Sequence, residues 1–272
     1  MPATAWAGEA ASSSSTTHLV NGSVRFYHYG QGGIRDHGWG CGYRTVQSIL
    51  SWIQPAELPP SIPELQQILD GATSDGTTSG NNSWIGVPDA VVLLDVLHDA
   101  SVRILPLRSG ADALAHMPTL AAHFDGGGGP LMVGGGGDVY SKTVVGVRVG
   151  AEAALLILDP HYAGPPAGGP GASIETLRAE GWASWKPLSC LSPHSFYNIA
   201  LPIPLKKASE CTVALLRSSG SLADPGDGGG VPETSRWVME VVQEGVAGDT
   251  DDGASGPEEW AMEVVAEGVG GS

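Results

Sequence analysis

Nearly all the periodic apolar segments of this 272-residue chain lie in residues 20–205, and that limit constrains its fold more than any other feature. A stretch of this length is about the size of one compact domain. Residues 1–19 are small, polar and rich in serine and threonine, whereas residues 206–272 are rich in glycine and acidic residues. Neither flank contains enough apolar surface to fold alone. We therefore predict one domain over 20–205, a disordered N-terminus over 1–19 and a disordered acidic tail over 206–272.

Within the domain, helical patterns come first and strand patterns follow. Apolar residues at helical spacing predict a helix that begins at Cys41 and ends before Pro55, then helices over 62–69 and 87–97. The glycines between 126 and 137 lack the Gly-Lys-Ser/Thr ending of a phosphate loop, so we interpret them as turns. Short apolar or β-branched runs predict buried strands at 102–107, 131–133, 143–149, 155–159 and 196–201. This order indicates an α+β fold rather than alternating βαβ units.

Charge and cysteine content exclude several classes of function. The net charge of −16 argues against nucleic-acid binding, and residues 218–272, with 12 acidic residues and 1 basic residue, contribute −11 of it. No apolar run is long enough to cross a bilayer, and the N-terminus lacks the pattern of a secretory signal. The three cysteines are too few and too scattered for a disulfide framework or a zinc site. We expect a soluble cytoplasmic protein with no membrane span, metal or cofactor.

The first candidate for chemistry is Cys41, which is predicted to lie at the start of a helix. Unpaired backbone N–H groups and the helix dipole favour a thiolate there, and the thiolate is the nucleophilic form of cysteine. Glycines at positions 38, 40 and 42 would let a substrate backbone approach closely. The Cys41 N–H could also contribute to an oxyanion hole. The pattern therefore favours a nucleophile, although a lone cysteine is most often a small core residue.

The second candidate is the segment Asp159-Pro160-His161, which follows an apolar run. In an extended chain, residues i and i+2 point to the same side, so Asp159 and His161 can face one cleft. His161 would then be the general base for Cys41, and Asp159 would orient the imidazole ring. The ordinary alternative is a turn after a strand. A metal site is a further alternative, but these residues lack the spacing of a metal-binding motif.

A longer block, from Tyr29 to Arg44, narrows these alternatives. Its sequence, Tyr-Gly-Gln-Gly-Gly-Ile-Arg-Asp-His-Gly-Trp-Gly-Cys-Gly-Tyr-Arg, resembles the active-site segment of the ubiquitin-fold-modifier-specific proteases. The resemblance covers about residues 23–205. Later segments agree in the same order: Ser83-Trp84-Ile85-Gly86, then Pro130 to Gly136 with Ser141-Lys142, Leu158-Asp159-Pro160-His161-Tyr162, Gly181-Trp182 with Trp185-Lys186, and Phe196-Tyr197-Asn198 to Pro202.

This resemblance implies a papain-like cysteine protease fold, with the nucleophile at the start of a central helix that packs on a mainly antiparallel sheet. It implies Cys41 as nucleophile, His161 as base and Asp159 as the residue that orients it. The tyrosine twelve residues before the nucleophile, Tyr29, would donate its hydroxyl to the oxyanion. Tyr27 is a nearby competitor for that task.

The same resemblance implies substrate contacts from Trp39 and Trp84. About 20 residues precede the matched region, so the chain looks like the short members of the family and not like those with a large N-terminal domain. The implied activity is cleavage after the C-terminal glycine of the modifier precursor and release of the modifier from lysines of its targets. The modifier is thus the expected partner, and partners could recruit the protein to the surface of the endoplasmic reticulum.

Two alternatives remain open at this point. One is a related papain-like peptidase that acts on ubiquitin chains or on lipid-conjugated, autophagy-type modifiers. The other is a non-catalytic adaptor that only binds the modifier. The presence of Cys41, Asp159, His161 and Tyr29 together argues against the adaptor.

The acidic tail contains an internal repeat, in which Trp-Val-Met-Glu-Val-Val and Trp-Ala-Met-Glu-Val-Val begin at positions 237 and 260. An extended strand would place one set of apolar residues from each copy on one side: Trp237, Met239 and Val241, and Trp260, Met262 and Val264. Peptides that add to a sheet edge have this pattern. It is similar to the motif by which the activating enzyme of the same modifier binds it, and to motifs that bind autophagy-type ubiquitin-like proteins.

We therefore expect two docking motifs, over 236–246 and 259–269, that bind the modifier or an autophagy-type partner. An amphipathic helix packed on the domain is the alternative, because Trp237 and Val241 also stand at helical spacing. The flanking glycines and acidic residues disfavour a stable helix.

Overall fold

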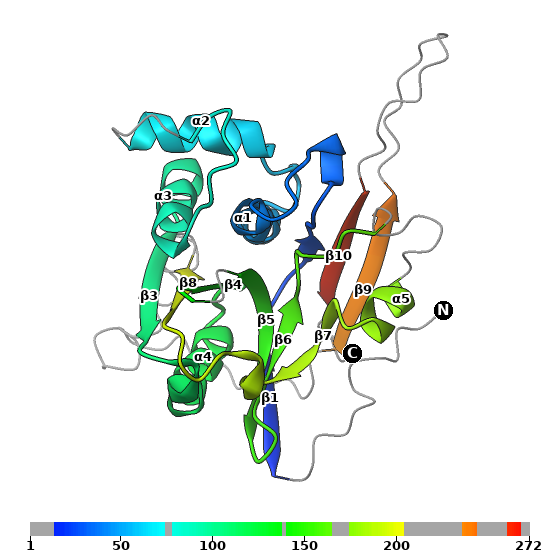
Figure 1. Cartoon of the computed structure of the whole chain (residues 1–272). Coiled ribbons are helices and arrows are strands. Elements are labelled where there is room, and N and C mark those ends of the chain that lie inside the picture. The colour runs from blue at the N-terminus through cyan, green and yellow to red at the C-terminus, as the bar shows by residue number, and fades with distance from the viewer. Residues whose placement is uncertain are drawn as a thin grey trace, which may run out of the picture.

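A computed structural model describes residues 14–73, 78–137, 140–164, 174–203, 236–243 and 260–267. Within these residues, the main feature is an antiparallel sheet of seven strands (Figure 1). The strands are β1 (Ser15–Leu19), β3 (Ser101–Leu107), β4 (Leu131–Gly135), β5 (Ser141–Gly150), β6 (Ala154–Leu158), β7 (Ala183–Pro187) and β8 (Tyr197–Ile203). The helices are α1 (Cys41–Ile53), α2 (Ile62–Ala72), α3 (Val87–His98), α4 (Ala113–Asp125) and α5 (Ile174–Ala179). The fold is α+β, as the sequence predicts.

The order of strands in the sheet is β3-β8-β4-β5-β6-β7. Strand β5 is long enough to have two partners on one side, because its first half pairs with β4 and its second half pairs with β1. Strands β5 and β6 form a hairpin with a register shift between Val144 and Gly146. The hairpin ends at Leu158, so the residues that follow it emerge at the end of the sheet where β5 begins.

Helix α1 is the central helix, and twelve of its thirteen residues, all except Ile53, are buried. Helices α2 and α3 surround it, and both begin with local signals. Ser61 and Glu64 form a capping box at the start of α2. At the start of α3, the Gly86 N–H donates to the Asp89 carboxylate at 2.8 Å. These caps fix the starts of the two helices, which lie beside α1 (Figure 1).

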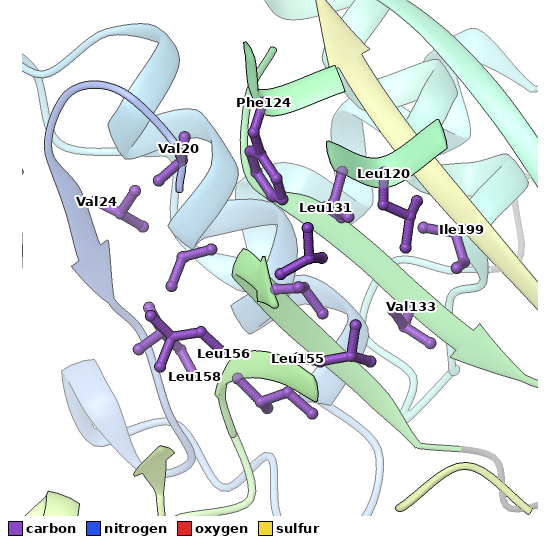
Figure 2. Packing of buried hydrophobic residues seen from close by; sticks show 14 of the residues in the cluster. Val20, Val24, Leu120, Phe124, Leu131, Val133, Leu155, Leu156, Leu158 and Ile199 are labelled. Atoms are coloured by element: carbon purple, nitrogen blue, oxygen red, sulfur yellow. The ribbon is translucent and has the colours of Figure 1, made fainter. Parts of the chain in front are cut away.

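Hydrophobic clusters lie on both faces of the sheet, because side chains alternate along its central strands. In β4, Leu131 and Val133 belong to one cluster, which also contains residues of α4, and Met132 belongs to the other, which contains residues of α1, α2 and α3. Figure 2 shows Leu120 and Phe124 of α4 packed near Leu131 in the first cluster. The sheet thus separates α4 from α1, α2 and α3.

Several elements of the domain are absent from the sequence expectations: β1, β2 (Val24–Phe26), α4, α5 and β7. Strand β1 lies within the segment expected to be disordered, and it pairs with Val149 and its neighbours in β5. Its Ser/Thr-rich sequence gives no apolar signal, so the pairing comes from tertiary context. Helix α4 was not predicted, because Pro118 interrupts its periodic pattern. None of the helices in the described residues has the length and apolar composition needed to cross a membrane.

Both copies of the tail repeat are strands in the described residues. Strands β9 (Arg236–Gln243) and β10 (Trp260–Glu267) pair antiparallel, and β10 also pairs with β2 (Val24–Phe26) to give the order β2-β10-β9 (Figure 1). The repeat is therefore extended at these segments, and not helical. The expected disorder over 206–235, 244–259 and 268–272 lies outside the described residues, as does that over 1–13.

Candidate active site

Cys41 is the first residue of α1, and its side chain is buried. The helix N-terminus at this position favours a negative charge on the sulfur. The next residue is Gly42, and a side chain has no space at this position: an added Cβ would lie 2.7 Å from the Ile85 carbonyl oxygen. The Trp84-Ile85 segment therefore lies directly against the start of the helix that carries Cys41.

Asp159 and His161 follow strand β6, and their side chains are hydrogen-bonded. The backbone N–H of Asp159 donates to the Trp182 carbonyl at 2.8 Å, which anchors the segment to the residue just before β7. The Tyr162 N–H approaches the Asp159 carbonyl at 3.4 Å, so the segment is a turn and not the extended chain that the sequence suggested. Within this turn, His161 Nδ1 lies 2.6 Å from Asp159 Oδ1.

Tyr29 joins the two halves of the site. Its backbone N–H donates to the Pro160 carbonyl at 3.0 Å, and its hydroxyl forms a hydrogen bond with Cys41. Its ring also meets the His161 ring edge to face, with ring centroids 5.3 Å apart. The backbone N–H of Tyr27 instead donates to the Ser48 hydroxyl in α1. The structure therefore places Tyr29 against Cys41 and His161.

The electrostatic environment favours a charged pair between Cys41 and His161. Burial would raise the pKa of the Cys41 thiol, but His161, the Ser141 backbone N–H and the Tyr29 hydroxyl together lower it below its ordinary value. Burial would lower the pKa of His161, but hydrogen bonds with Asp159 and Cys41 raise it to about 9. Because the two shifts have opposite signs, the site favours the pair of thiolate and imidazolium over the neutral pair.

Two further features make the site ready for substrate. Burial, followed by the charge of Cys41, raises the pKa of the Tyr29 phenol, so this hydroxyl keeps its proton as a donor. The His161 Nε2 atom is buried and has no hydrogen bond of regular geometry within the described residues. Catalytic hydrogen bonds are often poorly aligned in a free enzyme and tighten when substrate binds.

A buried ion pair supports the loop that carries Tyr29. Arg44 Nε lies 2.7 Å from Asp36 Oδ2, and the side chains of both residues are almost completely buried. The other oxygen of Asp36 accepts from the Gly30 N–H at 2.8 Å, next to Tyr29. An added Cβ on Gly40 would lie 2.5 Å from the Asp36 side chain, so the glycine before Cys41 is needed for this packing. The ion pair thus connects the loop before Cys41 with the helix that begins at Cys41.

The other candidate residues occupy different environments. Trp39 is 9% exposed, its indole N–H donates to the Arg35 carbonyl, and its ring packs on Tyr43, so it offers little surface to a substrate. Trp84 is 52% exposed beside the start of α1.

The six tail positions lie in β9 and β10, where Met262 pairs with Val241 and Val264 pairs with Met239. Trp237 and Trp260 lie in the same hairpin, at positions paired with Ala266 and Gln243.

Sequence reasoning gave no role to three residues that contact the site. Lys142 Nζ lies 3.2 Å from Asp159 Oδ2, and the Tyr140 ring lies edge to face with the His161 ring at 4.6 Å. The Ser141 backbone N–H donates to the Cys41 sulfur. Ser141 and Lys142 are the first two residues of β5 and Tyr140 directly precedes them, and only the register of the β5–β6 hairpin could have placed these residues beside Asp159. Within the described residues, no group of three or more acidic, histidine or cysteine side chains is arranged to hold a metal ion.

The fold and these side chains together define a class: a papain-like α+β domain with the thiol, imidazole and carboxylate arrangement of a cysteine peptidase. The profile of Peptidase family C78 matches residues 15–200, and the chain belongs to this family.

Similar proteins agree with this assignment. The chain is 38% identical over 187 residues to the Ufm1-specific protease 1 of Mus musculus. The matched region covers 66% of this chain and 83% of the mouse protein. It is 37% identical over 193 residues to the Ufm1-specific protease of Caenorhabditis elegans, covering 68% of this chain and 31% of that one. The crystal structure of UfSP from C. elegans superposes with a TM-score of 0.59 at 36% identity, over 70% of this chain and 34% of the other. The chain thus spans about a third of the length of the nematode relative.

Proposed function

We propose that this chain is a thiol protease that cleaves after the C-terminal glycine of the ubiquitin-fold modifier Ufm1. It would act on the Ufm1 precursor and on Ufm1 attached to lysine side chains. The observation that carries this proposal is the pair of opposite pKa shifts at Cys41 and His161, next to the protonated hydroxyl of Tyr29. The names of the similar proteins from mouse and nematode support Ufm1 as the substrate.

The proposed reaction begins when the Cys41 thiolate attacks the carbonyl carbon of the terminal glycine. The carbonyl oxygen becomes an oxyanion, which accepts hydrogen bonds from the Tyr29 hydroxyl and the Cys41 N–H. The C–N bond then breaks as His161 gives its proton to the leaving amine, and a thioester on Cys41 remains. His161 then takes a proton from a water molecule as the water attacks the thioester carbonyl, and the C–S bond breaks to release the modifier and to restore the Cys41 thiolate beside a protonated His161. Asp159 holds the imidazole ring in position throughout.

Trp84 is our candidate for contact with the body of the modifier. Its side chain is half exposed, and the neighbouring Ile85 carbonyl lies against the helix start at Gly42. A large apolar side chain so close to the nucleophile can bury surface of a bound protein. We assign Trp39 to positioning of the loop, because its side chain is packed on Tyr43.

We also propose a cytoplasmic site of action, since the reaction requires Cys41 as a free thiol.

The direct test is incubation of the full chain with Ufm1 precursor, followed by mass measurement of the products. Wild-type protein should release the residues that follow the terminal glycine, and Cys41→Ser should release none while remaining folded. Cys190→Ser is the matched control, because Cys190 is partly exposed and is expected to have no part in the chemistry. Cleavage by Cys41→Ser at the wild-type rate would refute the proposal.

A substrate panel separates the proposed function from its alternatives. Ubiquitin dimers, a lipid-conjugated autophagy-type modifier and a Ufm1 conjugate are compared at equal concentration. Only the Ufm1 conjugate should be cleaved at an appreciable rate. Preferred cleavage of ubiquitin or of the lipid conjugate would assign the chain to another substrate. Binding of Ufm1 with no cleavage of any substrate would assign it to the adaptor class.

We also propose that the tail repeat docks a ubiquitin-like partner through strand addition. In the hairpin, β10 has a partner on each side, whereas β9 is the last strand of its sheet within the described residues. A free strand edge can pair with the sheet of another protein. The register of β9 and β10 also brings the docking positions of both copies onto the same face of the hairpin, since Met262 is paired with Val241.

The docking proposal is tested with the double variant Trp237→Ala, Trp260→Ala in the full chain. Hydrolysis of a small peptide substrate should be unchanged, whereas capture of Ufm1 or of an autophagy-type ubiquitin-like protein should weaken. Val238→Ala, at a position of the alternate set in β9, is the matched control. Backbone amide shifts on titration with each partner identify the one that binds. Equal capture by the double variant and the wild type would remove any docking role for the repeat.

A further inference from the structure

We propose that Lys142 is a positioning residue of this active site, because its ammonium group fixes the Asp159 carboxylate in the orientation that holds His161. This inference rests on the proposed thiol-protease function for its kinetic consequence, but not for its geometry. The sequence assigns no role to Lys142.

The two oxygens of the Asp159 carboxylate have separate partners. Oδ1 faces His161, with the ring Nδ1 at 2.6 Å and the backbone N–H at 3.2 Å. Oδ2 faces Lys142, with Nζ at 3.2 Å. A carboxylate bound at one oxygen only can rotate about its Cβ–Cγ bond, and two partners on opposite oxygens restrict that rotation. Lys142 therefore limits the positions that the His161 ring can adopt.

Lys142 is itself well held for this purpose. It is the second residue of β5 and pairs with Val133 in β4, and the next residue, Thr143, pairs with Leu158 at the end of β6. This register brings the lysine next to Asp159 across the hairpin. Its Nζ also lies 6.0 Å from the centroid of the Tyr140 ring. Because its backbone is paired within the sheet, its side chain needs little reorganisation to contact the carboxylate.

The charge of Lys142 also keeps Asp159 ionised. Two titratable side chains face this carboxylate in the described residues, His161 from the same turn and Lys142 from β5. Burial would raise the pKa of Asp159, but the hydrogen bond with His161 and the charge of Lys142 lower it below its ordinary value. Without the lysine, Asp159 would accept a proton at higher pH, and His161 would lose its orienting partner there.

The test compares Lys142→Met, which removes the charge and keeps most of the stem, with Lys142→Arg, which keeps the charge. Lys186→Met in β7 is the matched control, because it changes the net charge equally at a residue that pairs with Leu155, four positions before Asp159. The first readout is the rate of Cys41 alkylation by iodoacetamide against pH, measured with the full chain. This readout does not depend on the identity of the substrate. The second readout is kcat and KM for cleavage of Ufm1 precursor.

The acid limb of the profile is the pH range in which the rate of Cys41 alkylation falls as the pH is lowered. For Lys142→Met we expect this limb to move to higher pH by about 1 unit, since loss of one opposite charge typically shifts a carboxyl pKa, here that of Asp159, by that much or more. We expect kcat to fall while KM stays the same. Lys142→Arg should restore most of the wild-type profile, and Lys186→Met should match the wild type. Urea unfolding of each variant checks that it is folded, and Lys142→Gln replaces Lys142→Met if the latter is not.

An unchanged acid limb in a folded Lys142→Met or Lys142→Gln protein overturns the proposal, as does a shift of equal size in Lys186→Met. Failure of the proposed function gives a different result. In that case the wild type would not cleave Ufm1 precursor at all, and the alkylation profiles would still decide the role of Lys142.

Discussion

Replacing Arg44 by methionine should destabilise the whole domain, because it leaves a buried carboxylate without its partner. The side chain of Arg44 is 3% exposed and that of Asp36 is 0% exposed, and their charged atoms are 2.7 Å apart. Removing one member of such a pair typically costs about 3–5 kcal/mol, since the remaining charge stays buried. Arg44 also donates to the Gln31 carbonyl at 2.7 Å and to Gln47 Oε1 at 3.1 Å. With these contacts also lost, we expect a loss in the middle of that range, about 4 kcal/mol.

A loss of that size is large for a single domain, whose total stability is usually about 5–15 kcal/mol. With a slope of about 2 kcal/mol per molar urea, the unfolding midpoint should fall by about 2 M. The assay is urea unfolding of the full chain, followed by tryptophan fluorescence. Arg103→Met is the matched control, because Arg103 is exposed on the edge strand β3, and its midpoint should stay close to that of the wild type.

A double variant, Asp36→Ala with Arg44→Met, separates the buried charge from the lost packing. Because it removes the unpaired carboxylate, it should be no less stable than Arg44→Met alone. The reasoning is refuted if Arg44→Met costs less than about 1 kcal/mol with an unchanged slope, since such a cost is usual for an exposed pair.

Further predictions concern Tyr29, two glycines and the pH dependence of stability. Tyr29→Phe should lower kcat for Ufm1 precursor by about 10²–10³, whereas Tyr27→Phe should not, and the reverse result would assign the oxyanion donor to Tyr27. Gly40→Ala should abolish cleavage and lower the unfolding midpoint, because the added Cβ would clash with the buried Asp36 side chain. Gly71 in α2 has open space around it, so Gly71→Ala should instead stabilise the protein by about 0.5–1 kcal/mol in urea unfolding. The pKa of His161 is raised from 6.5 to about 9, so its own contribution to stability is complete below about pH 6.5 and is lost as pH rises through 9, whereas the lowered pKa of Cys41 adds a contribution of opposite sign. In Cys41→Ala, which removes the opposing contribution, the free energy of unfolding should fall as pH rises above about 6.5. An equal fall after the further change His161→Ala would contradict the shift.

The parts of the site that follow from local patterns could be predicted from the sequence. Helical spacing after Gly40 placed Cys41 at the start of α1, and the structure has the helix begin there. An apolar run placed Asp159 and His161 after a buried strand, and they follow β6. The segment is a turn and not an extended chain, yet the turn still brings the two side chains to hydrogen-bonding distance. A turn was the ordinary alternative, and here it is compatible with the charged pair.

The parts that depend on pairing between distant segments could not be predicted in this way. Lys142 is close to Asp159 only because of the hairpin register, and a register shift lies between Val144 and Gly146. Such irregularities leave no clear signal in a single sequence. The ion pair between Asp36 and Arg44 was likewise hidden, since charged residues eight positions apart give no sign of burial. Pairing with β5 also explains why β1 forms in a segment without apolar periodicity.

The central claim is that Cys41 is the nucleophile, and covalent capture tests it most directly. The full chain is incubated with Ufm1 that carries an electrophile in place of its C-terminal carboxylate, and the attached residue is identified by peptide mass analysis. We expect one modifier per chain, attached at Cys41, and no attachment in Cys41→Ser. Attachment at Cys190 or Cys211, with cleavage of Ufm1 precursor retained in Cys41→Ser, would contradict the account.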